Sequence, residues 1–205
     1  MPLFPLFLKL RGRPCLVVGA GKISEGKIAG LLEAGAHVRV IALNATERIV
    51  HWHKTKKLRL KQRTFRPRDL DGMFLVVAAT NSPKVHRAIY RAARARKVLC
   101  NIVDVPPLCD FYYPAVVKRG NLQIAISTSG QSPALAKKIR QELERQYGPG
   151  YEQWVAELGE TRRTILASSL DSERKRSLLL SLASREAFEA AIAALTPTDQ
   201  RSQAA

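Results

Sequence analysis

Apolar residues in the first half of the chain fall into short continuous runs separated by longer segments with helical spacing. The clearest runs are residues 15–18 and 73–79, with a third at 98–103 that Asn101 interrupts, and turn-forming residues lie beside them. Continuous apolar runs of this length are typical of strands that are buried on both faces of a parallel sheet. Because these runs alternate with helical patterns, the sequence predicts an α/β fold built from a Rossmann-type parallel sheet.

The first run leads into a glycine turn and then into a helical pattern that stops at Gly35. Gly19 suits the sharp turn, and the missing side chain of Gly21 would let the backbone approach a phosphate. N–H groups at the start of the helix, near Lys22, would point at that negative charge. This context predicts the first unit of a dinucleotide-binding fold, although Gly-x-Gly also occurs in plain turns. The apolar stripe expected on the helix consists of Ile23, Ile28, Leu31 and Leu32.

The next two features bear on the choice of cofactor. Ser24 occupies the third glycine position of the fingerprint, and its small side chain would still let helix and strand pack closely. The strand expected at residues 37–44 carries no acidic residue at its end, where one would normally accept hydrogen bonds from the adenosine ribose. The residues themselves therefore leave NAD and NADP poorly distinguished.

Polar residues follow the run 73–79 at the point where a parallel strand would end. Open α/β sheets hold their ligands at the carboxyl ends of their strands, which makes Thr80 and Asn81 candidate cofactor contacts. The alternative is a role in starting the next helix, because Ser82 followed by Pro83 is typical of a helix N-terminus.

Asp104 ends the run 98–103 at the same expected edge of the sheet. A carboxylate there would face the ligand crevice, which makes Asp104 the best single candidate for an acid or base. The alternative is a turn aspartate that accepts backbone N–H bonds before the prolines at 106 and 107. Aromatic residues at 111–113 would supply flat surface close by.

The pattern changes after residue 114. Residues 115–126 are expected to form two short strands around the Gly120-Asn121 turn, which predicts a hairpin. A hydroxyl-rich loop follows at 127–133, and it could bind an anion through N–H groups and hydroxyls or could serve only to start a helix. The breaker at 148–150 precedes three further helical segments.

These changes predict three segments. Residues 1–114 are expected to form the dinucleotide-binding domain, residues 115–148 a small mixed α/β segment, and residues 149–205 a helical domain with a disordered tail over its last ten residues.

The net charge of +17 and the pI near 10.4 indicate a polyanionic partner. Nucleic acid is one candidate, yet the basic residues are spread over helix faces and no helix-turn-helix, zinc-finger or RRM signature is present. A small molecule with many carboxylates would exploit the same field, and a solvated basic surface is the third alternative.

Cysteine usage and hydropathy indicate a protein of the cytoplasm. The three cysteines cannot all pair, and Cys15 and Cys100 lie in apolar runs, where cysteine usually behaves as a small hydrophobe. No apolar run approaches the roughly 20 residues needed to span a bilayer, and the first residues lack the basic lead-in of a signal peptide. No metal-ligand spacing is present, and the four histidines are scattered.

Several of these features coincide in one family. The segments at 17–27, 32–36, 78–81, 100–104 and 126–133 together resemble the precorrin-2 dehydrogenase family of sirohaem biosynthesis, and the resemblance extends over residues 3–147. Ser24 replaces the usual alanine, and Gly26 stands where the family often has arginine.

The resemblance implies NAD-dependent oxidation of precorrin-2 to sirohydrochlorin by a homodimer built on the segment 115–148. A basic cleft would then hold the tetrapyrrole carboxylates, with no need for nucleic acid or a membrane. Asp104 corresponds to the aspartate assigned to catalysis in the family. Some members also insert iron into sirohydrochlorin, which the sequence does not decide.

The site expected from the residues and the resemblance has three parts. Asp104 is the catalytic group, and no resident metal is expected. The cofactor contacts are Gly19, Gly21, Lys22, Ile23, Ser24, Thr80, Asn81 and Val103. The substrate contacts are Asn101, Ser127, Thr128, Ser129, Gly130 and Ser132. The competing hypothesis is a non-catalytic dinucleotide sensor that binds nucleic acid or an acidic partner, and such a sensor has no need for Asp104.

Overall fold

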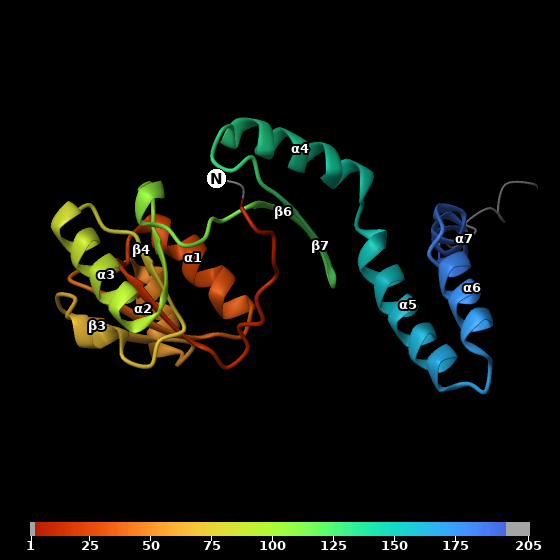
Figure 1. Cartoon of the computed structure of the whole chain (residues 1–205), viewed down its shortest axis with the longest axis horizontal. Helices are drawn as coiled ribbons and strands as arrows, with labels where there is room; N and C mark the ends of the chain where they lie inside the picture. Colours follow the sequence, from red (N-terminus) through yellow and green to blue (C-terminus); the bar gives the residue numbers. More distant parts are fainter. Residues whose placement is uncertain (1–2, 196–205) are drawn as a thin grey trace, which may run out of the picture. The chain divides into compact units, whose positions relative to one another are not determined.

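The computed structural model describes residues 3–195 (Figure 1). The chain consists of two compact units. We call Met1–Tyr113 the sheet unit and Pro114–Ala205 the helical unit. Among the described residues, no helix is both long enough and apolar enough to cross a membrane. The disordered tail expected over the last ten residues lies outside the described part of the chain.

A five-stranded parallel sheet forms the centre of the sheet unit. Its strands follow the order β3-β2-β1-β4-β5, and every neighbouring pair is parallel. The strands are β1 (Pro14–Val18), β2 (His37–Ala42), β3 (Arg59–Gln62), β4 (Leu75–Ala78) and β5 (Leu99–Ile102). The sequence runs without polar interruption through β1 and β4 because both faces of these strands are covered. This arrangement confirms the predicted Rossmann-type α/β fold.

Helices cover the two faces of this sheet. They are α1 (Lys22–Glu33), α2 (Glu47–Lys54) and α3 (Pro83–Arg96). Val17 and Val40 pack in one buried cluster with residues of α1 and α2, whereas Leu16 and Ile41 pack in a second cluster with residues of α3. Alternate strand residues therefore feed two separate cores, as expected for side chains that point to opposite faces.

Two expectations about buried residues have different outcomes. Cys15 and Cys100 are completely buried, and burial raises the pKa of their thiols to about 11 and about 12, so both act as small hydrophobic residues. The apolar stripe of α1 is shorter than predicted. Ile28 and Leu31 are buried, but Ile23 is 61% exposed because the first turn of the helix directs Ser24 and Glu25, and not Ile23, toward the protein interior.

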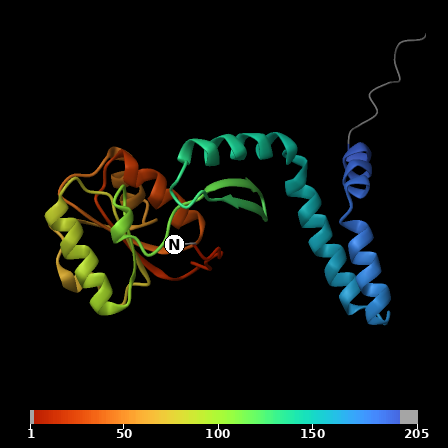
Figure 2. The ribbon, with the colours of Figure 1, turned by 45° about the horizontal axis from the view of Figure 1, so that its top comes forward.

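The helical unit begins with the predicted hairpin, β6 (Ala115–Arg119) and β7 (Leu122–Ile126), which pair antiparallel. Four helices follow, as Figure 2 shows. They are α4 (Pro133–Gln146), α5 (Gly150–Ala167), α6 (Ser172–Leu182) and α7 (Arg185–Leu195). The Ser132 hydroxyl accepts a hydrogen bond from Leu135 N at 3.2 Å, which caps the start of α4.

Polar and aromatic contacts connect these elements. Arg119 on β6 donates to the carbonyl oxygens of Tyr147 and Glu144, at 2.9 and 3.0 Å, and so satisfies free acceptors at the end of α4. Tyr151 stacks on Phe188 with ring centroids 4.1 Å apart, which holds α5 against α7. Within the described part of this unit, only Val117 and Ala136 are buried apolar residues.

Candidate active site

The candidate site lies at the carboxyl ends of β1, β4 and β5. Strand order reverses between β1 and β4, because β2 and β3 extend the sheet on one side and β5 extends it on the other. Open α/β sheets place their ligand crevice at such a switch point. Gly19, Thr80 and Asp104 follow these three strands, so the topology brings the predicted phosphate turn, cofactor contact and acid to one edge of the sheet.

The two glycines of the turn have different roles. Gly19 has a φ of 103°, and a Cβ on it would lie 2.1 Å from the Ala79 carbonyl oxygen, so only glycine fits between β1 and β4. Gly21 precedes α1 in extended backbone, and nothing lies within 4 Å of the position its Cβ would take. The first glycine therefore makes the turn possible, and the second leaves open space where a phosphate can approach.

Three buried hydroxyls around this turn have no hydrogen-bond partner in the described structure: Ser24, Thr46 and Thr80. Ser24 lies in the first turn of α1 and is fully buried. The Thr46 N–H donates to the Ala20 carbonyl at 3.0 Å, and the Thr80 methyl lies 3.2 Å from the Cβ position of Gly19. Unpaired buried hydroxyls are costly, so their grouping here fits a site completed by a polar ligand. The residues present thus fit a dinucleotide.

The remaining predicted cofactor contacts are distributed around the turn. Lys22 and Ile23 begin α1 and are exposed, as is Asn81 after β4. The Val103 N–H donates to the Ala78 carbonyl at 2.9 Å, which ties the end of β5 to β4. Ser82 caps α3 by accepting from Val85 N at 3.4 Å, so capping does not occupy the Thr80 hydroxyl.

Asp104 is exposed at the end of β5 and has a φ of 61°. A non-glycine residue in this left-handed region is uncommon, and such residues cluster at functional sites. Within residues 3–195 its carboxylate accepts no hydrogen bond, so the alternative of a turn aspartate that caps backbone N–H groups finds no support. The side chain is free to meet a ligand.

Lys27 on α1 is the neighbour of Asp104 that sequence reasoning missed. Burial lowers the pKa of Lys27, and the charge of Asp104 partly opposes that shift. The Lys27 ammonium also lies 3.5 Å from the centroid of the Tyr113 ring. Burial raises the pKa of Tyr113 to about 12, so this phenol stays neutral. Only the position of Lys27, one turn after the glycine loop, could have indicated this contact.

Asn101 is placed differently from the other predicted substrate contacts. Its side chain is almost completely buried and donates to the Phe111 carbonyl at 2.7 Å and to the Cys109 sulfur at 3.6 Å. Both bonds hold the segment after β5 against the sheet. In this conformation the NH2 group of Asn101 supports the loop that carries Asp104.

The predicted substrate loop belongs to the helical unit, and its backbone is largely self-contained. Ser129 and Gly130 both have positive φ, 51° and 82°. The N–H groups of Ser129 and Ser132 donate to the hydroxyls of Ser127 and Thr128, and Gln131 N–H donates to the Thr128 carbonyl at 2.9 Å. These three amides are therefore unavailable to an anion, and the loop can offer its hydroxyl hydrogens and its remaining N–H groups.

Comparisons with known proteins identify the domains in which these residues lie. Residues 6–115 match the family model for a putative NAD(P)-binding domain, and residues 119–146 match the model for the central domain of sirohaem biosynthesis proteins. The siroheme synthase of Methylococcus capsulatus is 42% identical over 144 residues, which make up 70% of this chain and 30% of that protein. The siroheme synthase of Methylobacillus flagellatus is 36% identical over 176 residues, 86% of this chain and 38% of that protein.

This chain therefore spans about a third of the length of these curated relatives. A solved structure of SirC, a precorrin-2 dehydrogenase, is similar along nearly its whole length, with a TM-score of 0.79 and 31% identity. The alignment covers 91% of this chain and 92% of SirC. By sequence, domain content and fold, the chain belongs to the precorrin-2 dehydrogenase family of sirohaem biosynthesis.

Proposed function

We propose that this protein oxidises precorrin-2 to sirohydrochlorin with NAD. The observation that carries the proposal is Asp104, a free carboxylate in a left-handed conformation at the sheet edge that also holds the glycine turn. A sensor that only binds a dinucleotide has no use for a base at this place.

The chain's own residues would bind and orient the dinucleotide. The space over Gly21 admits the pyrophosphate, and the first N–H groups of α1 face its charge. The hydroxyls of Ser24 and Thr80 are available to hydrogen-bond the same ligand. Lys22, Ile23, Asn81 and Val103 are proposed to complete this contact surface. When bound, the nicotinamide supplies the two-electron acceptor for the oxidation.

The residues that follow β2 favour NAD over NADP as the cofactor. Binding of a 2′-phosphate there normally uses an arginine. Arg48, at the start of α2, lies 3.8 Å from the Glu25 carboxylate and its guanidinium lies 4.9 Å from the Trp52 ring centroid. Its charge is therefore already paired, and a second anionic group would have to compete with Glu25.

Asp104 is proposed to accept a proton from precorrin-2 as the substrate loses two electrons. The role requires the ionised carboxylate, and Lys27 supplies a positive charge that interacts with it. Exposure of Asp104 allows a bulky substrate to reach it. Insertion of iron would use the same group to remove pyrrole protons, and it is an activity to be measured separately.

The net charge of +17 is explained by the acetate and propionate groups of the proposed substrate, which are negatively charged. A basic surface steers a polycarboxylate toward the site and accounts for the charge with no role for nucleic acid. We place the hydroxyls of Ser127, Thr128, Ser129 and Ser132, with the Gly130 turn, among the substrate contacts. Asn101 is proposed to act through the Asp104 loop. We propose the cytoplasm as the site of reaction.

We further propose a homodimer formed through the helical unit. Its described part buries only Val117 and Ala136, while Val116, Leu135, Leu178 and Leu180 are exposed. A fold with so little internal core gains stability when a second copy covers its apolar side chains. The three-segment division at 1–114, 115–148 and 149–205 remains part of this proposal.

The direct test is anaerobic incubation of the protein with precorrin-2 and NAD, followed by absorbance of sirohydrochlorin. Turnover with NAD, and slower turnover with NADP, is the expected result. Substrate capture should weaken as salt screens the charges, since the Debye length is about 10 Å at 0.1 M. No turnover, together with salt-sensitive DNA binding, would favour the dinucleotide sensor.

A further inference from the structure

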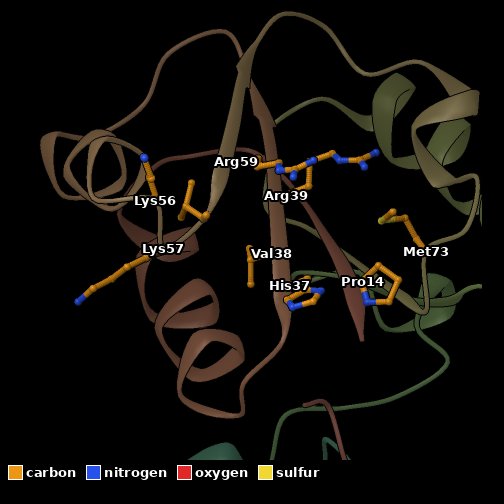
Figure 3. Close-up of a pocket in the computed structure, with 9 residues that line it drawn as sticks. Pro14, His37, Val38, Arg39, Lys56, Lys57, Arg59 and Met73 are labelled. Atoms are coloured by element: carbon orange, nitrogen blue, oxygen red, sulfur yellow. The ribbon is translucent and has the colours of Figure 1, made fainter. Parts of the chain in front are cut away.

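A cavity of about 400 Å³ lies at the amino-terminal edge of the sheet, opposite the edge that carries the candidate active site (Figure 3). Its wall is formed where β1, β2 and β3 begin and where the chain enters β4. The apolar part of the lining consists of Pro14, Val38, Leu58 and Met73. The polar part consists entirely of basic residues: His37, Arg39, Lys56, Lys57 and Arg59.

Arg39 and Arg59 are the unusual pair within this lining. They are register partners on the adjacent parallel strands β2 and β3, so their side chains leave the same face of the sheet from backbones about 4.8 Å apart. Like charges placed directly opposite each other destabilise a sheet. Within residues 3–195, neither guanidinium forms an ion pair or a hydrogen bond with another side chain. The repulsion between the two guanidinium groups is therefore not offset by a counter-charge in the free protein.

Protection of the sheet edge does not explain this arrangement. Lysine and arginine on the edge strand β3 would prevent pairing with another sheet, and that is a common use of charge. Arg39, however, lies on β2, which is paired on both sides and has no edge to protect. It is half-buried, and its register partner on β1 is the fully buried Leu16. A charge at this inner position needs a counter-charge.

The surroundings determine what kind of counter-charge fits. Residues 54–68 contain eight Lys and Arg and no acidic residue, and no carboxylate is among the residues that line the pocket. Two adjacent guanidinium groups match the spacing of oxygens on phosphate or carboxylate groups. Met73 packs in the same cluster as Leu16, the register partner of Arg39, so it lies on the face of the sheet that carries the two arginines. With Pro14 it offers an apolar wall there, while Lys57 extends outward and adds charge at the rim (Figure 3). The volume is that of a small-molecule pocket.

We propose that this pocket binds a small, multiply anionic ligand, whose phosphate or carboxylate groups pair with Arg39 and Arg59 while its apolar part rests on Pro14 and Met73. The site is separate from the glycine turn, because it lies at the other end of the same strands. It does not depend on the proposed dehydrogenase activity. A compound bearing phosphates and one bearing carboxylates share this chemistry, and the two sources are separated by the choice of probe.

The test uses inorganic triphosphate and citrate as probes at constant ionic strength. Each is titrated into the full chain by calorimetry, and the bound site is mapped by NMR shifts of backbone amides. We expect shifts at His37, Val38 and Leu58. Tighter binding of triphosphate would identify a phosphorylated ligand, and tighter binding of citrate a carboxylated one. Shifts confined to Gly19 and Gly21 would overturn the proposal.

The decisive variant is the double substitution Arg39→Gln with Arg59→Gln, and its control is Arg87→Gln with Arg91→Gln on the exposed face of α3. Loss of two charge-assisted contacts should weaken probe binding at least about tenfold in the first variant and leave it unchanged in the second. An equal loss in both variants would mean that the probes sense only the overall charge, which contradicts a built site.

Thermal stability gives a second readout. Removing the like-charge pair should leave the melting temperature of the ligand-free variant equal to or above that of the wild type, while the rise caused by the anion disappears. A lower melting temperature without ligand would indicate that the two arginines serve the fold. Binding of duplex DNA at salt concentrations where neither probe binds would also overturn the proposal, in favour of a nucleic-acid surface.

Discussion

The two units of this protein bury their apolar residues to very different extents. The sheet unit places Leu16, Val17, Val76 and Val77 in full burial along two adjacent strands, with helices on both faces. In the helical unit, an aromatic cluster and the hydrogen bonds that Arg119 donates hold the elements together. A large internal core fixes the edge of a sheet and the residues on it. A thin core leaves apolar side chains available to a partner.

The largest predicted difference concerns the same substitution in the two units. Leu16→Ala should destabilise the sheet unit by about 2–5 kcal/mol because it leaves a cavity in a fully buried core. Leu180→Ala, at a position that is 65% exposed, should change stability by no more than about 0.5 kcal/mol in the monomer.

Each unit contains one tryptophan, Trp52 and Trp154. Denaturation followed by fluorescence in the Trp154→Phe and Trp52→Phe backgrounds would therefore report on each unit separately. A loss of stability from Leu180→Ala that grows with protein concentration would place this leucine in the dimer interface. It would also strengthen the contrast between the two units. Equal losses of stability from Leu16→Ala and Leu180→Ala at low protein concentration would contradict this contrast.

The second prediction separates the two roles of the glycine turn. Gly19→Ala should cost about 1–3 kcal/mol from the backbone alone, and the contact with the Ala79 carbonyl adds to that loss. Gly21→Val should leave the melting temperature nearly unchanged, because its Cβ meets open space, and should greatly weaken binding of NAD. Calorimetric titration of the folded variant with NAD measures the effect. Wild-type affinity in Gly21→Val would mean that the loop is only a turn.

Much of the sheet unit could be predicted from the sequence because burial on both faces leaves continuous apolar runs. The runs at 73–79 and 98–103 contain β4 and β5, and the position of Asp104 follows from the end of the second run. The carboxyl ends of parallel strands share one edge of a sheet, so the apolar pattern alone is enough to group Gly19, Thr80 and Asp104.

Contacts between distant segments could not be predicted in the same way. Lys27 meets Asp104 and Tyr113 only because α1 packs beside the chain that leaves β5, and no periodic pattern encodes that proximity. The Arg39 and Arg59 pair depends on the register of β2 with β3. The shortage of buried residues in the helical unit was equally hidden, because helical spacing reveals an apolar face but does not reveal what covers it.

The third prediction concerns an ion pair within the sheet unit. Arg63 donates to both oxygens of Asp69, at 2.8 and 2.6 Å, and Arg66 N donates to the same carboxylate. Burial alone would raise the pKa of Asp69, but these bonds and the nearby charges lower it overall. Arg63→Gln should therefore cost about 1.5–3 kcal/mol at pH 7.

The difference from the wild type should shrink as the pH falls. The pKa of Asp69 is lower in the folded state than in the unfolded state, so its contribution is complete above about pH 4 and is lost as the pH falls through the folded pKa. Urea denaturation from pH 3 to 7 would measure this. The control is Arg96→Gln, whose partner Asp71 is 64% exposed and should contribute less than about 1 kcal/mol. A pH-independent loss in Arg63→Gln would argue against the assignment.

The central claim is that Asp104 removes a proton from precorrin-2. The most direct measurement is anaerobic steady-state oxidation by Asp104→Asn and by the control Asp71→Asn, both at matched NAD saturation. Removal of a general base typically costs about 10²–10⁴-fold in rate. We expect a loss of that size in Asp104→Asn, with NAD affinity and melting temperature unchanged, and wild-type turnover in Asp71→Asn. Near-normal turnover by Asp104→Asn would contradict the account and would leave positioning of the substrate beside the nicotinamide as the main source of catalysis.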